Sequence, residues 1–341
     1  MNLADLNKIA LAMVTPGKGI LAADESSGTI KKRFEAIKVE STEESRRDYR
    51  EMLFRSTEAM SKYISGVILY DETIWQNAKD GTALVKLIEA SGAIPGIKVD
   101  EGTQGLPNCP GELITAGLDK LAERLKKYYE RGARFAKWRA VIDIGSNIPS
   151  MTAIHVNAHA LARYAALCQA AQIVPIVEPE VLMDGDHDID RCYEVTSRVL
   201  NKTFQELRVQ RVALEGMILK PNMAIAGKNS AKQASVEQVA EKTIRLLKAC
   251  VPAAVPGIAF LSGGQNDEEA TAHLNAMNRT SGLPWRLTFS YGRALQAAPQ
   301  KAWSGRPENV AAGQRAFTHR ARMNALASKG EWETGLEKKA A

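Results

Sequence analysis

Eight short apolar runs, separated by longer segments with helical spacing, restrict the fold of this chain more than any other feature. The runs cover residues 19–24, 66–71, 94–100, 133–141, 173–180, 214–221, 257–264 and 286–292. Between them, residues 118–132 have the apolar spacing of a helix that stops at Gly132, and 41–44 and 235–238 match the capping box of a helix start. Strands that alternate with helices, without a charge-rich or low-complexity break, predict an α/β fold: a single-domain (β/α)8 TIM barrel over residues 1–341.

The composition is that of a folded soluble protein. Hydrophobic residues make up 45% of the 341 residues and charged residues 25%, which excludes a disordered chain. The four cysteines, at positions 109, 168, 192 and 250, are too few and too dispersed for a disulfide scaffold. No apolar run of about 20 residues is present, and Asp5 and Lys8 interrupt the N-terminal segment where a secretion signal would be apolar. We therefore expect a cytoplasmic protein without a membrane partner.

The charge balance predicts no nucleic-acid partner. The net charge is +6, but the basic residues are scattered, with the densest groups at 31–33, 46–47 and 126–127. None of these groups alternates with aromatic residues as in a single-strand binder. A modest positive excess equally suits an enzyme whose substrate is a phosphorylated small molecule.

Polar residues end the apolar runs at regular intervals along the chain. They are Asp24, Asp71, Lys98, Lys137, Glu178, Lys220, Ser262 and Ser290. In a barrel the carboxyl ends of the strands form one rim, where active sites lie, so these residues are expected to converge. A single polar strand end has a simple explanation, since strand ends reach solvent. Their repetition around the ring favours a functional rim.

Lys220 is the candidate nucleophile on this rim. It directly follows the apolar residues Met217, Ile218 and Leu219. Apolar walls and neighbouring cations favour a free amine over an ammonium group, and a free amine attacks a carbonyl to form a Schiff base. The alternative is a lysine whose stem packs in the core and whose ammonium group reaches water. The local sequence leaves both interpretations open.

Two pairs of charged residues lie on strand faces near this position. Lys137 and Arg139 are two residues apart and so share one face of a strand, as do Glu178 and Glu180. Two inward cations need anions between them, such as a phosphate or a carboxylate, and paired carboxylates near ammonium groups suit proton transfer. The alternative is an internal network of salt bridges.

Two glycine-containing loops are candidate phosphate sites. LSGGQ (261–265) and SYGRA (290–294) follow the seventh and eighth runs, the positions where barrels often bind phosphate through backbone N–H groups. The second loop also supplies Arg293. A third candidate, at residues 24–33, offers the hydroxyl and cationic side chains of Ser26, Thr29, Lys32 and Arg33.

The residues predict no metal site. DGDHDID (184–190) has the carboxylate density of a calcium loop but lacks its glycine at position 6 and its glutamate at position 12, so we expect a loop leading into a helix. His155 and His159 are four residues apart, but the glutamate of an HExxH zinc motif is missing.

At this level of detail the sequence resembles the class I fructose-1,6-bisphosphate aldolases. Segments of that family recur in the same order and at similar spacing from about residue 16 to residue 326: GILAADES, GIKVD, FAKWR, VPIVEPE, LKPNM, FLSGGQ and SYGRALQA. The resemblance implies a (β/α)8 barrel that cleaves fructose 1,6-bisphosphate into dihydroxyacetone phosphate and glyceraldehyde 3-phosphate in glycolysis. It further implies the reverse condensation in gluconeogenesis, no metal or other cofactor, and a homo-oligomer, commonly a tetramer.

The same resemblance implies catalytic roles for five residues. Lys220 is expected to form the Schiff base, and Glu178 to shuttle protons while the carbinolamine forms and loses water, with Glu180 beside it. Asp24 is expected to take the proton of the C4 hydroxyl during C3–C4 cleavage, and Lys137 to balance charge at the rim.

Substrate contacts are implied in the same way. The C1 phosphate is expected at Ser262, Gly263, Gly264, Ser290, Gly292 and Arg293. The rest of the sugar and the far phosphate are expected at Ser26, Thr29, Lys32, Arg33 and Lys98, with Arg139 on the same rim. Thr29 stands where the family often has serine and keeps the hydroxyl, whereas Glu101 stands where a lysine is frequent, which bears on affinity for the far phosphate.

The C-terminal segment departs from the family pattern. Animal and plant members usually end in a mobile tail whose terminal tyrosine reaches the active site, whereas this sequence ends GEWETGLEKKAA. We expect residues 327–341 to form a flexible tail that contributes little to proton transfer. The alternative is a tail docked through Trp332.

Two other functions fit part of this pattern. One is a different Schiff-base barrel, of the transaldolase or deoxyribose-phosphate aldolase type, and the other is an aldolase-like scaffold that binds sugar phosphates or proteins without turnover. Two phosphate loops across one rim favour a bisphosphate substrate. The presence of Lys220, Glu178 and Asp24 together favours an enzyme.

Overall fold

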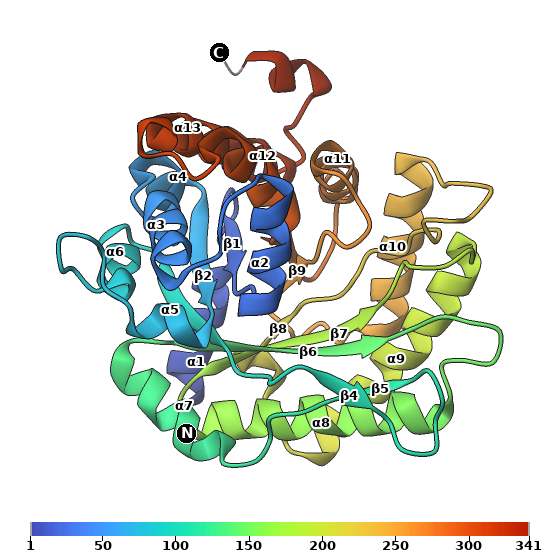
Figure 1. The fold of residues 1–341 in the computed structure, drawn as a ribbon. Coiled ribbons are helices and arrows are strands. Elements are labelled where there is room, and N and C mark those ends of the chain that lie inside the picture. The colour runs from blue at the N-terminus through green and yellow to red at the C-terminus, as the bar shows by residue number, and fades with distance from the viewer. Residues whose placement is uncertain (1, 340–341) are drawn as a thin grey trace.

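A closed barrel of eight parallel strands forms the centre of the molecule in the computed structural model, which describes residues 2–339 (Figure 1). The strands are β1 (Gly19–Ala23), β2 (Ile64–Leu69), β3 (Ile94–Lys98), β6 (Phe135–Ile142), β7 (Val174–Val181), β8 (Ile218–Leu219), β9 (Gly257–Phe260) and β10 (Arg286–Tyr291). They follow one another around the barrel in chain order, and β10 pairs with β1 to close it. Each strand overlaps one of the eight apolar runs, so the predicted (β/α)8 barrel is confirmed.

Helices surround the strands. They are α1 (Leu3–Met13), α2 (Ser27–Ala36), α3 (Glu43–Phe54), α4 (Thr57–Lys62), α5 (Asp71–Trp75), α6 (Leu84–Ala90), α7 (Leu121–Arg131), α8 (Met151–Ala170), α9 (Ile189–Val209), α10 (Val236–Cys250), α11 (Asp267–Asn278), α12 (Arg293–Trp303) and α13 (Val310–Ala327), with 3-10 turns η1 (Leu214–Gly216), η2 (Pro307–Asn309) and η3 (Thr334–Lys339). As expected, α7 stops at Gly132, whose φ of 115° suits glycine.

One of the two predicted capping boxes is confirmed and the other is displaced by one residue. Ser235 and Gln238 cap α10 as predicted. The box at 41–44 is wrong by one residue, because Thr42 and Ser45 exchange the two capping hydrogen bonds at the start of α3. The Ser45 hydroxyl can return the hydrogen bond that the pattern assigned to a glutamate.

The barrel interior is filled by apolar side chains below the rim, and α1 closes its lower end. Ile20, Ile68, Ile176 and Ile218 form one buried cluster with Phe135 and with the inner face of α1. A Cβ at Gly96 would overlap the ring of Phe135, so this strand position needs glycine. A packed, apolar floor leaves the rim as the place for polar groups.

A short hairpin outside the barrel was not predicted. Strands β4 (Thr103–Gly105) and β5 (Leu113–Thr115) pair antiparallel between β3 and α7. Their sequence is short, rich in glycine and proline, and lacks the apolar alternation that marks a strand. The Thr115 hydroxyl donates to the carbonyl of Arg139 at 2.8 Å and so ties the hairpin to β6.

The segment after α13 packs through two residues. Trp332 is buried, and Glu337 accepts hydrogen bonds from its indole at 2.9 Å and from Arg320 at 2.5 Å. The η3 turn lies at the top of the view in Figure 1. The flexibility expected for residues 327–341 stays a prediction, and residues 340 and 341 lie outside the described part.

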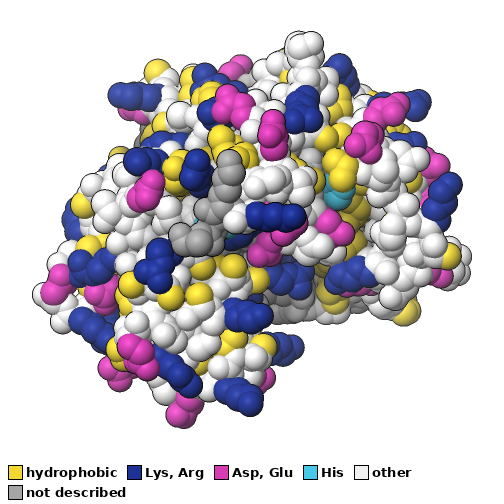
Figure 2. Space-filling model, turned by 90° about the horizontal axis from the view of Figure 1, so that it is seen from above, with side chains coloured by type: hydrophobic (Ala, Val, Ile, Leu, Met, Phe, Trp, Pro, Cys, Tyr) yellow, Lys and Arg dark blue, Asp and Glu magenta, His cyan; other side chains and the backbone are white. Residues whose placement is uncertain are grey.

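The surface carries mixed charge. Seen from above, lysine and arginine side chains are interspersed with aspartate and glutamate and do not form one large basic patch on this face (Figure 2). None of the helices within residues 2–339 combines the length and apolar character needed to cross a membrane.

Candidate active site

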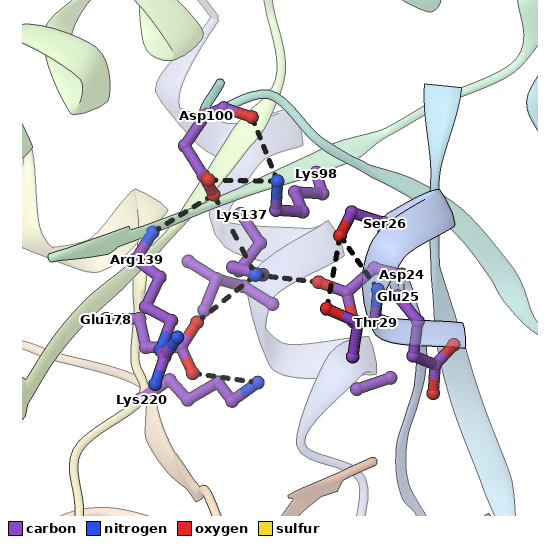
Figure 3. A network of polar contacts seen from close by, with 12 residues as sticks. Asp24, Glu25, Ser26, Thr29, Lys98, Asp100, Lys137, Arg139, Glu178 and Lys220 are labelled. Carbon is purple, nitrogen blue, oxygen red and sulfur yellow. Dashed lines mark hydrogen bonds and ion pairs between the residues drawn. The ribbon is translucent and has the colours of Figure 1, made fainter. Parts of the chain in front are cut away.

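Charged side chains converge at the carboxyl ends of the barrel strands, as the sequence predicted (Figure 3). Asp71 is the exception, because it is exposed after β2 and accepts a hydrogen bond from the Tyr128 hydroxyl on α7 at 2.7 Å instead. Asp24 follows β1, Lys98 ends β3, Lys137 and Arg139 lie on β6, Glu178 and Glu180 lie on β7, and Lys220 follows β8. Together with Asp100 after β3, they place four cations against four carboxylates. The hydrogen-bond register between neighbouring parallel strands determines which of these side chains lie at the same level along the barrel axis.

Lys220 and Glu178 form the inner contact of this group. The register pairs Val177 with Leu219, so the next residue on each strand meets its neighbour. The Nζ atom of Lys220 lies 3.1 Å from Oε1 of Glu178, and the two residues are only 4% and 3% exposed. The expected alternative of a lysine that reaches water is therefore wrong for Lys220. A carboxylate, and not a second cation, is the charged group nearest to it.

Lys137 connects Glu178 to Asp24. Its Nζ atom lies 2.6 Å from Oδ2 of Asp24, 3.5 Å from Oε2 of Glu178 and 3.9 Å from Oδ2 of Asp100. Burial opposes charge on Asp24, but the ammonium groups of Lys137 and Lys220 hold the pKa of its carboxyl well below the usual range. Burial also opposes charge on Lys137, but the carboxylates of Asp24, Glu178 and Asp100 raise its pKa. Both groups are thus charged at neutral pH.

Arg139 pairs with the second glutamate of β7. Its Nε atom donates to Oε2 of Glu180. Burial opposes the charge, but Glu180 and then Glu178 raise the pKa of the guanidinium. The anions between the two cations of β6 are therefore protein carboxylates, so an internal salt-bridge network is present. The side chain of Arg139 is still 42% exposed, which leaves part of the guanidinium open to an anion from solvent.

Asp100 belongs to this group and was not singled out from the sequence. Its Oδ1 atom lies 2.9 Å from Nζ of Lys98, and its Oδ2 atom accepts from the backbone N–H of Arg139 at 3.4 Å. It ends the same apolar run as Lys98, so the argument from polar strand ends applies to it too. That signal could have found it.

Glu25 is a second residue that sequence reasoning missed. It is buried and binds Arg33, while its Oε1 atom also accepts from Nε2 of Gln296 at 2.8 Å. The buried Arg50 donates to its backbone carbonyl at 2.9 Å. Glu25 therefore orients Arg33 beside the rim. Its partners come from α2, α3 and α12, and no local pattern indicates this.

The SGG loop forms a tight turn next to the charged group. The Gln265 N–H donates to the Ser262 carbonyl at 3.2 Å, and Gly264 has a φ of 76°, which glycine adopts without strain. A Cβ at Gly263 would lie 3.2 Å from Oε1 of Glu180, and one at Gly264 would overlap Met183. The turn thus lies beside Glu180, with Met183 packed against it.

The second glycine-containing loop begins at the end of β10 and leads into α12. Ser290 is buried, and its hydroxyl has no hydrogen-bond partner in the described part of the chain. Arg293 begins α12, is exposed, and forms no ion pair with another described residue. A Cβ at Gly292 would lie 3.7 Å from Nη2 of Arg33, so Arg33 adjoins this loop. An unpaired hydroxyl and an unpaired guanidinium suit an incoming phosphate.

The hydroxyl groups of residues 24–33 are used in a helix cap. Ser26 caps α2 by accepting from the N–H of Thr29 at 3.4 Å, and their hydroxyl oxygens lie 3.1 Å apart. Lys32 is exposed and forms no ion pair within residues 2–339. The structure therefore brings Ser26, Thr29 and Arg33 to the edge of the group, and Lys32 is an exposed side chain on the same helix.

The two sequence motifs that resemble metal sites have other contacts. Asp188 caps α9, so residues 184–190 lead into a helix as predicted. His155 and His159 both face Glu206 on α9, at 3.4 and 3.3 Å. In the described part of the chain, no three His, Cys, Asp or Glu side chains are grouped so as to hold a metal ion.

Known proteins share this sequence and fold. The family model for "Fructose-bisphosphate aldolase class-I" matches residues 5–341. A protein of Xanthomonas campestris pv. campestris, "Probable fructose-bisphosphate aldolase class 1", is 58% identical over 98% of this chain and 100% of its own length. "Fructose-bisphosphate aldolase 4, cytosolic" of Arabidopsis thaliana is 54% identical over 94% of this chain and 81% of its own. The solved structure of fructose-bisphosphate aldolase from Plasmodium falciparum, in complex with TRAP and a small molecule inhibitor, has a TM-score of 0.96 at 48% identity, covering 98% of this chain and 96% of that one.

Proposed function

The chain belongs to the class I fructose-bisphosphate aldolase family and reversibly cleaves fructose 1,6-bisphosphate into dihydroxyacetone phosphate and glyceraldehyde 3-phosphate, and we propose that it does so through a Schiff base on Lys220. Enzymes of this class work without a metal. One observation carries the assignment: Lys220 and Glu178 are buried together at the rim, with Nζ and Oε1 3.1 Å apart.

Schiff-base formation starts with a proton transfer from Lys220. The nearby carboxylate of Glu178 can accept a proton from the ammonium group, which leaves an amine to attack the C2 carbonyl of the substrate. The resulting carbinolamine loses its hydroxyl as water, and Glu178 returns the proton that this loss requires. A C2 iminium on Lys220 results.

Cleavage follows because the iminium accepts the electrons of the breaking bond. Asp24 takes the proton of the C4 hydroxyl, the C3–C4 bond breaks, and glyceraldehyde 3-phosphate leaves. The electron pair moves into an enamine on Lys220, which takes a proton at C3 and is then hydrolysed to dihydroxyacetone phosphate. Lys137, 2.6 Å from Asp24 and 3.5 Å from Glu178, balances the charge on both carboxylates through these steps.

Substrate phosphates bind at the edge of the charged group, because the cations at its centre, Lys137 and Lys220, already have carboxylate partners. Additional positive charge at the edge comes from Arg293, which forms no ion pair with another described residue, and from Arg33. The SGG turn, Ser290 and Arg293 would hold the C1 phosphate. Ser26, Thr29, Lys32, Arg33 and Lys98 would contact the rest of the sugar and the far phosphate.

We further propose that the enzyme is a cytoplasmic homotetramer whose partners are sugar phosphates. The cytosolic relative from Arabidopsis supports the location. Light scattering after size-exclusion chromatography tests the tetramer directly.

The experiment that tests this function is turnover of fructose 1,6-bisphosphate by purified enzyme treated with EDTA. We expect full activity after chelation, and rapid inactivation when borohydride is added together with dihydroxyacetone phosphate, because borohydride reduces the iminium to a stable amine. Loss of activity in EDTA that zinc restores would contradict the Schiff-base mechanism.

A further inference from the structure

A buried histidine holds the residue that closes the SGG turn. His273 lies on α11, and its Nδ1 atom is 2.8 Å from Oε1 of Gln265. Both residues are 7% exposed. Gln265 is the last residue of the turn, since its N–H donates to the Ser262 carbonyl at 3.2 Å. The histidine therefore contacts the turn from the side of the helix that follows it.

This contact fixes the orientation of the Gln265 amide. An amide oxygen only accepts hydrogen bonds, so Nδ1 of His273 carries the proton and donates it. Burial lowers the pKa of His273 to about 4, against the opposing charges of Glu269 and Glu237, so the ring is neutral at physiological pH. The hydrogen bond to His273 is the only one that the Gln265 side chain makes within the described part of the chain.

The turn is held from two sides. Met183 packs against Gly263 and Gly264, and Gln265 is anchored to His273. Two consecutive glycines give a loop many conformations, and ordering it on binding reduces affinity unless the fold orders it beforehand. Backbone N–H groups bind a phosphate well only when they are already oriented.

We propose that His273 is a positioning residue for the C1-phosphate subsite, which holds the Gln265 amide and thereby keeps turn 262–265 in its phosphate-binding form. The inference rests on the proposed function, in which this turn binds the C1 phosphate. His273 does not touch the substrate and acts through Gln265. Removing its N–H should therefore weaken phosphate binding and leave the chemistry at Lys220 intact.

Two variants separate the hydrogen bond from packing. His273→Leu removes the donor, whereas His273→Asn keeps an N–H one bond from Cγ, where Nδ1 stands. We expect KM for fructose 1,6-bisphosphate and for fructose 1-phosphate to rise about tenfold in His273→Leu, with kcat within threefold, the size of one lost hydrogen bond. His273→Asn should restore both KM values to within threefold of the parent enzyme.

Phosphate-free dihydroxyacetone distinguishes a local effect on the turn from a general structural defect, because a general defect would also slow the reaction of this ketone with Lys220. Borohydride trapping of this ketone should proceed at the same rate in the parent and His273→Leu enzymes, because it makes no use of the turn. Gln265→Met tests the route of action: the double variant with His273→Leu should be no worse than either single variant. If the increases in KM of the two single variants add up in the double variant, His273 does not act through Gln265. This comparison can be made even if His273→Leu is less stable than the parent enzyme.

Arg293→Ala distinguishes failure of this inference from failure of the proposed subsite. A raised KM in Arg293→Ala together with a KM within twofold of the parent in His273→Leu overturns the positioning role alone. Unchanged KM values in both variants overturn the C1-phosphate subsite and the positioning role together. Raised values in both, with rescue by His273→Asn, support the proposal.

Discussion

The Oε1 atom of Glu178 lies 3.1 Å from Nζ of Lys220, and both side chains are buried at the rim of the barrel. Two oppositely charged groups at this distance can exchange a proton directly, without a water molecule between them. The second oxygen of Glu178 faces Lys137 at 3.5 Å, so the carboxylate keeps a cationic partner when Lys220 loses its proton. This arrangement accounts for a lysine that is paired in the resting enzyme and still becomes a nucleophile.

Glu178→Gln should slow Schiff-base formation. Glutamine fills the same space but cannot take a proton, and loss of a general acid or base costs about 10²- to 10⁴-fold in rate. The measurement is the rate of iminium trapping by borohydride with dihydroxyacetone phosphate. Glu180→Gln is the matched control, because Glu180 contacts Arg139 rather than Lys220. If the trapping rate falls further in Glu180→Gln than in Glu178→Gln, the proton transfer belongs to Glu180 and the assignment to Glu178 is wrong.

Asp24→Asn should separate cleavage from Schiff-base formation. Without a base for the C4 hydroxyl, kcat for fructose 1,6-bisphosphate should fall at least about 100-fold, while trapping of dihydroxyacetone phosphate continues. If trapping is lost to the same extent as cleavage, Asp24 acts earlier in the reaction than proposed.

The lowered pKa of Asp24 also predicts part of the pH profile. A carboxyl whose folded pKa lies below its unfolded value of about 3.9 contributes stability above that value, and loses it only as the pH falls through the folded pKa. Asp24 is therefore ionised throughout the range in which the enzyme is assayed. An acidic limb in kcat above pH 4.5 that disappears in Asp24→Asn would contradict this.

Arg293→Ala should weaken binding of the C1 phosphate. A charge-assisted, bidentate contact of arginine with phosphate contributes about 2–3 kcal/mol, so KM should rise roughly thirty- to a hundredfold. Arg322→Ala, which removes an exposed arginine on the next helix, α13, serves as control and should leave KM unchanged. A KM within twofold of the parent enzyme in Arg293→Ala would remove this residue from the subsite.

His273 predicts a loss of stability in mild acid. Its pKa is about 4 in the folded state against about 6.5 in the unfolded chain, so between these values the unfolded chain binds more protons. The free energy of unfolding should therefore fall by up to about 1.4 kcal/mol per pH unit on acidification from pH 6.5 to 4. Urea unfolding at pH 7, 6 and 5 measures the slope, and His273→Asn should flatten it. Equal slopes in the parent and the variant would contradict the low pKa.

The sequence predicted the barrel and much of the rim because both depend on regular geometry. Apolar runs at intervals of one strand and helix specify the strands, and parallel strands bring their carboxyl ends together. For this reason Asp24, Lys137, Glu178 and Lys220, far apart in the sequence, lie in contact as expected.

Other parts of the site depend on contacts between side chains that are far apart in the sequence, and no local sequence pattern indicates such contacts. The partners of Glu25 come from three helices, and a buried glutamine such as Gln296 looks like any polar helix residue in the sequence. The β4–β5 hairpin was missed for a related reason, since its strands lack apolar alternation. His273 was also overlooked, because its role depends on one contact with Gln265 and not on a motif.

Identifying the lysine that becomes covalently attached to the substrate tests the central claim most directly. The enzyme is incubated with dihydroxyacetone phosphate, reduced with borohydride, digested, and analysed by mass spectrometry. We predict one added substrate mass per chain, on the peptide that contains Lys220, and no adduct in Lys220→Met. An adduct on Lys137 or Lys98, or an unmodified but active Lys220→Met enzyme, would contradict the account.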